Sequence, residues 1–422
     1  MRRGWWPVLA AAVGVLACGG EQADAPASSE AVSDPLSRAR GILARTPVFD
    51  GHNDLPWEIR TTDAAPMDVE AYDLDAPVPG HTNLDLLRAG GVGAQFWSVY
   101  IPGEYADSGF ARLQLEQIDI ARRMIDRYPE LLLAGTADEV EAAMSGGRIA
   151  SMLGVEGGHA IENSLGALRT YYELGARYMT LTHNVTLDWV DAAQDTASHD
   201  GLNGFGEEVV REMNRLGMLV DLSHVSPATM SDALTVSEAP VMFSHSSARA
   251  LTDVPRNVPD SILARMPANG GVVMVTFVQP FVNQDAADYD DRIGAMVDAM
   301  RAEGTPDDEI RAEVGRIRRE SPRPSASLDD IADHIEHVRD VAGIDHVGIG
   351  SDYDGMNAPP VMPDVSSYPV LFAHLIERGW TDEDLGKLAS GNILRALREA
   401  EGVAHRLQAE RPPSTAVISD FD

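Results

Sequence analysis

A histidine and a carboxylate two residues apart follow the first apolar run of the chain. His52 and Asp54 lie in the segment DGHND. On an extended strand, residues i and i+2 point to the same side, so this pair can offer one nitrogen and one oxygen to a single cation. Zinc accepts both kinds of atom. An isolated pair of this kind is a weak signal, because most such pairs in proteins bind no metal.

Further polar groups follow later apolar runs. They are Glu156 in GVEGGHA, His183 in LTHN, His224 in DLSH, His245 in FSHSS and Asp352 in GIGSDYDG. Alone, each has a structural interpretation: a buried histidine is more often simply hydrogen-bonded, and Glu156 could accept N–H groups from the Gly-Gly turn after it. A joint interpretation is more specific. Three imidazoles and two carboxylates can hold two cations if one carboxylate bridges them; these residues are His52, Asp54, Glu156, His224 and His245.

The elements that would position these groups are eight short apolar runs separated by longer amphipathic stretches. The runs span residues 46–50, 91–99, 148–155, 177–181, 217–222, 239–243, 271–277 and 345–349. This alternation predicts β-α units and a parallel sheet, and eight such units close into a (β/α)8 TIM barrel. Catalytic groups of such barrels project from the C-terminal ends of the strands, which is where the polar residues above fall.

One connection is longer than an ordinary crossover. Residues 280–327, between the seventh and eighth runs, are rich in charge and in helix-forming residues. Gly304, followed by Thr-Pro, predicts the end of one helix and the start of the next. We therefore expect an inserted helical hairpin that acts as a lid, as a partner surface or only as a solvated excursion. The whole barrel is expected at 39–410, with a C-terminal tail at 411–422.

The N-terminal end resembles a bacterial lipoprotein signal. Two arginines precede an apolar stretch, residues 5–17, that is too short to span a bilayer. Cleavage before Cys18 would leave its sulfur free for lipidation, whereas an ordinary signal peptide would be cut nearby. We expect residues 1–17 to be the signal peptide and 18–38 a flexible acidic tether. The mature protein would then be an exported bacterial lipoprotein, periplasmic or at the cell surface, attached to the membrane only through its lipid.

Charge and cysteine content exclude several classes of function. The chain of 422 residues has 33 Lys and Arg against 66 Asp and Glu, a formal net charge of −33. Such an acidic protein repels nucleic acid, so we expect no partner of that kind. Cys18 is the single cysteine, which excludes an internal disulfide and a thiolate metal site. A homodimer, if formed, would depend on noncovalent contacts.

Several segments together resemble the membrane dipeptidase family, also called renal dipeptidases. They are DGHNDLPW, GVEGGHAI, LTHN, DLSHVS, FSHSSARAL, RNVPD and GIGSDYDG, in the family's order and spacing. The similarity extends from about residue 40 to 400. It implies a distorted (β/α)8 barrel, a dipeptide substrate and a centre with two Zn²⁺ ions per chain, and it assigns the ligands. His52 and Asp54 would hold one ion, His224 and His245 the other, and Glu156 would bridge them.

Three more residues match the substrate site of the family. His183 is implied to bind substrate and could stabilise the tetrahedral oxyanion. Arg256, in RNVPD, would bind the terminal carboxylate in a bidentate fork, which would limit substrates to dipeptides. Asp352 would take a proton from water and pass it to the departing amine. The implied nucleophile is a hydroxide bridging the two zinc ions.

Two other functions stay open at this point. A different hydrolase of the same barrel type could act on lactones, cyclic amides or phosphoesters, but many of those enzymes use HxH and a carboxylated lysine where this chain has HxD and Glu156. A lipoprotein that binds peptides without catalysis is disfavoured by the complete set of ligands. Within the dipeptidase interpretation, dipeptides with a C-terminal D-residue and β-lactams are further candidate substrates.

Overall fold

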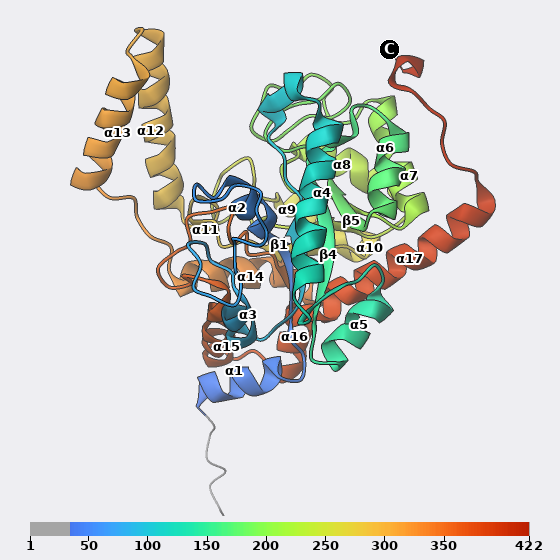
Figure 1. Cartoon of the computed structure of the whole chain (residues 1–422), viewed down its shortest axis with the longest axis horizontal. Coiled ribbons are helices and arrows are strands. Elements are labelled where there is room, and N and C mark those ends of the chain that lie inside the picture. Colours follow the sequence, from blue (N-terminus) through green and yellow to red (C-terminus); the bar gives the residue numbers. More distant parts are fainter. Residues whose placement is uncertain (1–33, 422) are drawn as a thin grey trace, which may run out of the picture. The chain divides into compact units, whose positions relative to one another are not determined.

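The computed structural model describes residues 34–421, apart from the side chains of residues 106–108 (Figure 1). The predicted signal peptide and Cys18 lie outside the described residues. Helix α1 (Pro35–Leu43) begins before residue 39, so the folded part starts slightly earlier than predicted. In the part of the chain described here, no helix is long and apolar enough to cross a membrane.

Eight parallel strands form the wall of a barrel. They are β1 (Val48–Asn53), β2 (Val92–Ser98), β4 (Ile149–Glu156), β5 (Ala176–Thr180), β6 (Leu219–Asp221), β7 (Val241–Phe243), β8 (Val272–Val275) and β9 (Val347–Ile349). Between β9 and β1 the ring is joined by backbone hydrogen bonds just past the strands, from Asp54 N to Tyr353 O and from Asp352 N to His52 O. Each predicted run overlaps one strand, and the predicted TIM barrel is confirmed.

The sheet also contains a ninth strand that the sequence did not predict. Strand β3 (Leu131–Leu133) pairs with the first residues of β4. Strand β2 pairs with one edge of β4 along its length. The other edge of β4 pairs first with β3 and then, from Leu153 onward, with β5. A run of three leucines shows no periodicity, so its pairing depends on tertiary contacts that local sequence does not contain.

Helices cover the outside of the barrel. The longer ones are α2 (Leu55–Thr61), α3 (Leu84–Gly90), α4 (Phe110–Arg127), α5 (Ala137–Ser145), α6 (Leu165–Glu173), α7 (Gly204–Leu216), α8 (Pro227–Val236), α14 (Leu328–Ala342), α15 (Tyr368–Glu377) and α17 (Asn392–Glu410). Short helices α9 (Asp260–Leu263), α10 (Met266–Asn269), α11 (Gln279–Val282) and α16 (Asp382–Gly386) lie in the connections. Helix α7 has clear end signals: Asn203 caps its first turn, and Gly217 ends it with φ +83°.

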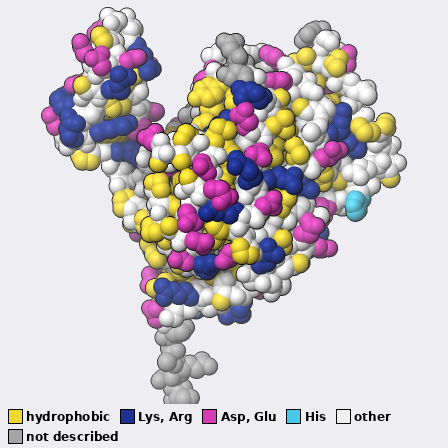
Figure 2. Space-filling model, viewed as in Figure 1, with side chains coloured by type: hydrophobic (Ala, Val, Ile, Leu, Met, Phe, Trp, Pro, Cys, Tyr) yellow, Lys and Arg dark blue, Asp and Glu magenta, His cyan; other side chains and the backbone are white. Residues whose placement is uncertain are grey.

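The inserted segment between β8 and β9 contains two helices, α12 (Gln284–Ala302) and α13 (Asp307–Glu320). They pack against each other and join at Gly304, which has φ +79°. In α13 only Ile310 is buried. Arginines and acidic residues crowd the surface of this hairpin (Figure 2), and five arginines fall within residues 311–323.

The C-terminal tail packs along α6 and α7. Ser414 N donates a hydrogen bond to Glu212 (3.2 Å), and Arg169 donates one to the carbonyl of Ser414 (3.0 Å). The ring of Phe421 lies 6.4 Å from that of Phe205. The two prolines end α17 as expected, but the residues after them are held by specific contacts.

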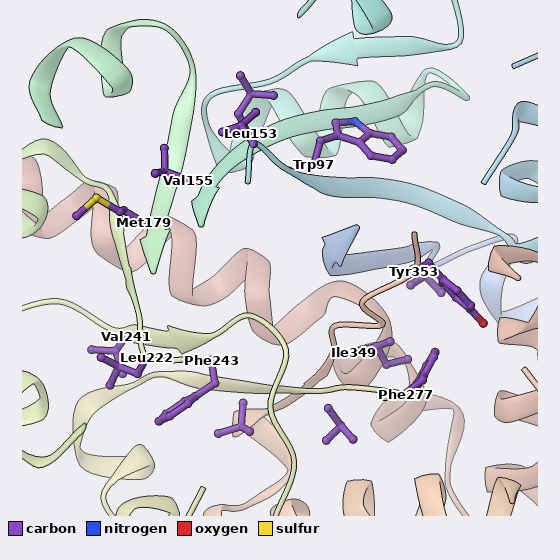
Figure 3. Packing of buried hydrophobic residues seen from close by; sticks show 14 of the residues in the cluster. Trp97, Leu153, Val155, Met179, Leu222, Val241, Phe243, Phe277, Ile349 and Tyr353 are labelled. Carbon is purple, nitrogen blue, oxygen red and sulfur yellow. The ribbon is translucent and has the colours of Figure 1, made fainter. Parts of the chain in front are cut away.

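The core has two parts, because strand residues alternate between the helix layer and the barrel interior. Leu153 and Val155 of β4 belong to the larger cluster, which packs under the helices (Figure 3). Met152 directly precedes Leu153, so its side chain points to the opposite face of the strand, and it belongs to the inner cluster. There Phe96 stacks on Phe49, with ring centroids 5.1 Å apart. The inner cluster fills the interior of the barrel with apolar side chains, and the polar site residues lie beyond it at the C-terminal ends of the strands.

Candidate active site

The predicted site residues meet at the C-terminal mouth of the barrel. They come from the ends of β1, β4, β5, β6, β7 and β9 and from the loop after β7. One pocket of about 610 Å³ is lined by seven of the eight: Asp54, Glu156, His183, His224, His245, Arg256 and Asp352. The eighth, His52, is fully buried and contacts the same cluster. The structure therefore brings together every site residue that the sequence predicted, apart from Cys18.

Glu156 lies at the centre of this cluster, and its two carboxylate oxygens have different neighbours. Oε1 is 3.0 Å from Nε2 of His224 and 3.5 Å from Nε2 of His245. Oε2 is 3.4 Å from Nε2 of His52 and accepts a hydrogen bond from Ser98 Oγ (3.0 Å). One carboxylate thus faces two separate sets of nitrogen and oxygen atoms, which is the geometry a bridging ligand requires.

The first set surrounds Nε2 of His52. This nitrogen is 3.3 Å from Oδ2 of Asp54 and 3.7 Å from Oδ1 of Asp352. Nε2 of His52 and Oδ1 of Asp54 are buried and have no hydrogen-bond partner among the described residues. Buried polar atoms are nearly always paired, so atoms left without a partner in such a cluster fit an absent ligand. An imidazole and two carboxylates are suitable donors for a divalent cation.

The second set is formed by histidines. Nε2 of His224 and Nε2 of His245 are only 2.8 Å apart, and Nε2 of His183 is 3.9 Å from Oε1 of Glu156. Donor atoms that approach within 4.8 Å of one another form three groups: His52 with Glu156 and His245; Glu156 with His183 and His224; and His52 with Asp54 and Asp352. The residues present therefore fit two neighbouring cations with N and O ligands.

In three of these histidines the other ring nitrogen is held by a hydrogen bond, so Nε2 points into the cluster. The pairs are His52 Nδ1 with Tyr178 OH (2.8 Å), His224 Nδ1 with Asn184 Oδ1 (3.1 Å) and His245 Nδ1 with Ser244 Oγ (2.8 Å). Partners of this kind orient metal-binding histidines and set which nitrogen carries the proton. The amide oxygen of Asn184 accepts, so Nδ1 of His224 carries the proton and Nε2 carries the lone pair.

Two buried aspartates, which the sequence analysis did not single out, accept hydrogen bonds from residues that adjoin the cluster. Asp221, the last residue of β6, accepts hydrogen bonds from the hydroxyls of Ser244 (2.6 Å) and Thr180 (2.5 Å). Asp50 of β1 accepts from Ser351 N (2.8 Å) and from the hydroxyl of Tyr368 (2.6 Å). A carboxylate inside an otherwise apolar strand was the available signal, because an unpaired charge there would be costly.

The backbone at the mouth adopts conformations that most residues avoid. His224 has φ +68° and Asp352 has φ +70°, both in the left-handed region. Such conformations cost free energy and cluster at functional sites. Next to them the chain passes very close to the cluster at Gly355, where a Cβ atom would collide with Oδ2 of Asp54. Only glycine fits at that position without displacing the carboxylate.

Burial and neighbouring charges shift the pKa values of the central groups in different directions. Burial raises the pKa of Asp352 well above its usual value, although His52 opposes this shift. Burial would also raise the pKa of Glu156, but the neighbouring His52 and His224 outweigh it and hold that pKa well below its usual range. The protein's own groups therefore shift the pKa values of these two carboxyl groups in opposite directions.

Arg256 supplies the only guanidinium directly beside this cluster among the predicted residues. It is 2% exposed, its Nη1 has no hydrogen-bond partner among the described residues, and its Cζ lies 5.2 Å from the centre of the Phe281 ring. Burial lowers its pKa to about 10, so it stays charged at neutral pH. A buried cation with free donors, at the wall of a pocket, can bind an anionic group that enters the pocket.

Comparison with known proteins identifies the same family that the sequence motifs resemble. Residues 36–411 match the family described as membrane dipeptidase, peptidase family M19. Dipeptidase 3 from Mus musculus is 40% identical over 388 residues, which cover 90% of this chain and 70% of that protein.

Two solved structures share the fold. The probable dipeptidase PvdM from Pseudomonas aeruginosa has a TM-score of 0.76 at 24% identity, covering 88% of this chain and 99% of that one. A metallopeptidase from Rhodobacter sphaeroides, liganded with a phosphinate mimic of the dipeptide L-Ala-D-Ala, has a TM-score of 0.68 at 24% identity and covers 84% and 99%. From the family match and the identity to Dipeptidase 3, we conclude that this chain is a metallo-dipeptidase and belongs to the membrane dipeptidase family.

Proposed function

We propose that the enzyme hydrolyses dipeptides with a free C-terminal carboxylate and uses two Zn²⁺ ions. His52 and Asp54 would hold one ion, His224 and His245 the other, and Glu156 would bridge them. The observation that carries this proposal is that Oε1 and Oε2 of Glu156 face different sets of donor atoms. Bound zinc would supply a hydroxide nucleophile near neutral pH and would polarise the peptide carbonyl.

The protein's own groups would orient the substrate and move protons. Arg256 would bind the C-terminal carboxylate, because its free donors face the pocket. His183 would stabilise the carbonyl oxygen as negative charge develops on it. Asp352, whose Oδ1 lies 3.7 Å from Nε2 of His52, would take the proton from water and pass it to the departing amine.

Binding at Arg256 would also limit the length of the substrate. A guanidinium that holds the carboxylate one residue beyond the scissile bond leaves no room for a longer peptide. We extend the proposal to dipeptides with a C-terminal D-residue, since the R. sphaeroides metallopeptidase is liganded with a mimic of an L,D-dipeptide. β-Lactams belong to it as well, because they present an amide beside a carboxylate.

A library of L,L- and L,D-dipeptides, assayed with the purified protein before and after chelation, tests this function. We expect two zinc ions per chain by elemental analysis, hydrolysis that chelation abolishes and added zinc restores, and little hydrolysis of tripeptides or dipeptide amides. Dipeptide amides are the matched control, because they lack only the carboxylate that Arg256 would bind. Hydrolysis that survives complete metal removal, or equal rates with the amides, would overturn the proposal.

We also propose that the mature enzyme is an exported bacterial lipoprotein, attached through Cys18 at the periplasmic side or the cell surface, and that any dimer is noncovalent. The support is the N-terminal sequence pattern alone. Cys18→Ser should move the protein from the membrane fraction to the soluble fraction while leaving the signal stretch intact. Unchanged membrane association of this variant would argue against lipidation.

A further inference from the structure

A second arginine lines the pocket and takes no part in the proposed mechanism. Arg323 follows α13, at the return of the inserted hairpin to the barrel. Its side chain is 24% exposed, so the guanidinium is accessible from the pocket without being free in solvent. Two arginines near the end of α13, Arg318 and Arg319, are exposed instead and do not line the pocket.

The position of Arg323 is set by an ion pair within the insertion. Its Nη1 donates a hydrogen bond to Oδ2 of Asp290 in α12, at 2.9 Å. Within the described range, Asp290 is the only hydrogen-bond or ion-pair partner of Arg323. A guanidinium has five N–H donors, so most of its donors stay available to a ligand.

Arg323 and Arg256 line the same pocket, and helix α11 contacts the chain segment of each. The short helix α11 follows β8. The ring of its Phe281 packs against the guanidinium of Arg256, and Oε1 of its Gln279 accepts a hydrogen bond from the backbone N–H of Ala326, three residues after Arg323, at 3.3 Å. Gln279 and Phe281 also line the pocket. The segment that carries Arg323 is thereby tied to the part of the barrel that positions Arg256.

Carboxylates occupy other parts of the pocket lining. Glu58 of α2 and Asp354 after β9 both line it. Burial raises the pKa of Glu58, and no charged partner offsets this shift among the described residues. A carboxylate on a substrate side chain would be repelled by an ionised Glu58 and attracted by Arg323.

We propose that Arg323 binds the side-chain carboxylate of an acidic C-terminal residue and so makes the enzyme selective for dipeptides that end in Asp or Glu. This inference rests on the proposed function, because it takes Arg256 as the site of the main-chain carboxylate. Two carboxylates of one residue would then each have a guanidinium. Asp290 acts as a positioning residue that holds the guanidinium of Arg323 at the pocket. Asp290 and Arg323 both belong to the inserted segment between β8 and β9.

The test compares kcat/KM for L-Ala-L-Glu and L-Ala-L-Gln, which differ in one charge at nearly equal size. If wild type hydrolyses L,D-dipeptides faster, the corresponding L,D pair is used. We expect wild type to prefer the glutamate substrate and Arg323→Gln to lower the ratio of the two kcat/KM values about tenfold, as loss of one charge-assisted hydrogen bond predicts. Most of the change should be in KM, since the contact is made equally before and during the reaction.

Three further variants sharpen the result. Arg319→Gln, in the same insertion but outside the pocket, should leave the ratio at the wild-type value. Arg323→Lys should keep part of the preference, because it keeps the charge without the fork. Asp290→Asn should lower the preference less than Arg323→Gln does, and raised salt should lower it in wild type through screening.

Several outcomes would overturn the inference. If both dipeptides are hydrolysed and Arg323→Gln leaves their ratio unchanged, Arg323 is a surface ion pair only, and the dipeptidase proposal stands. If Arg319→Gln lowers the ratio as much as Arg323→Gln, the effect is one of general surface charge. If neither dipeptide nor any other in the library is hydrolysed, the proposed function fails and this inference fails with it.

Discussion

At Glu156, one side chain connects two groups of ligands that come from opposite sides of the barrel mouth. Oε2 is near His52 and Oε1 is near His224 and His245. If the carboxylate bridges two cations, neither metal can be held normally without it. An amide at this position keeps the shape but removes the charge and one of the two acceptor oxygens.

We therefore expect Glu156→Ala and Glu156→Gln to lower kcat by at least about a thousandfold and to reduce bound zinc from two per chain toward one or none. Elemental analysis and dipeptide hydrolysis measure the two effects. Glu173→Gln, an exposed position at the end of α6, is the matched control and should change neither. Normal zinc content together with a normal rate in Glu156→Gln would remove the bridging role.

Asp221 affects the same site indirectly, through Ser244 and His245. Asp221→Asn replaces one acceptor by a donor, so the Ser244 hydroxyl loses its ordered partner and Nδ1 of His245 is held less well. We expect zinc affinity to fall about 10- to 100-fold, measured by competition with a chelator. Thr180→Val removes another hydroxyl from Asp221 but leaves the contact between Ser244 and His245, so its effect should be smaller. Equal affinity in Asp221→Asn and wild type would contradict this role.

At the scale of elements, the site was largely predictable because parallel strands end at one face of a barrel. The residues after β1, β4, β6 and β7 could be placed together from sequence alone, since the strand ends bring them to the same mouth. The left-handed backbone of His224 was not predictable, because a histidine carries no preference that signals it. Arg323 was missed for another reason: its place in the pocket depends on how the hairpin returns to the barrel.

The hairpin has few buried residues, so we expect it to contribute little to the stability of the barrel. Its buried residues in α12 are Ala286, Ala287 and Tyr289, all in the first turns, and the helix packs against α11 and α13. Replacing residues 293–318 by a short Gly-Ser loop keeps Asp290 and Arg323. We expect this deletion to change the thermal midpoint by less than about 3 °C, because almost no apolar surface of the barrel becomes exposed.

A barrel-covering helix provides the comparison. Ile335→Ala in α14, at a fully buried position, should cost about 2–5 kcal/mol and lower the midpoint by clearly more than the deletion does. Differential scanning calorimetry measures both variants. A deletion variant that unfolds at a lower temperature than Ile335→Ala would show that the distal hairpin supports the barrel.

At the scale of the whole molecule, the chain carries a large excess of acidic residues, and some of them are buried in ion pairs among the described residues. Glu212 of α7 is one of them. It is 1% exposed and accepts hydrogen bonds from Arg215 (2.8 Å), Arg169 (3.0 Å) and the backbone N–H of Ser414 (3.2 Å). It thus connects the C-terminal tail to the barrel through α6 and α7.

The effect of Glu212 on stability should depend on pH in a defined direction. Burial alone would raise its pKa, but the hydrogen bonds from Arg215 and Arg169 outweigh burial and lower that pKa below its ordinary value. A carboxyl group whose pKa is lower in the folded state binds fewer protons there than in the unfolded chain. Its contribution to stability is therefore complete above the unfolded pKa, about 4.3, and is lost as pH falls through the folded pKa.

We expect Glu212→Gln to lower the free energy of unfolding by about 2 kcal/mol at pH 7, less than a fully buried pair would lose, because Arg169 is partly solvated. Below about pH 4 the difference between wild type and variant should shrink progressively, since Glu212 takes up a proton as the pH falls through its folded-state pKa. Urea unfolding at several pH values measures this, with exposed Glu173→Gln as the control. Because the tail has lost an acceptor for Ser414, limited proteolysis should also cleave it sooner in Glu212→Gln. A difference that stays constant down to pH 3 would show that Glu212 acts through packing and not through its charge.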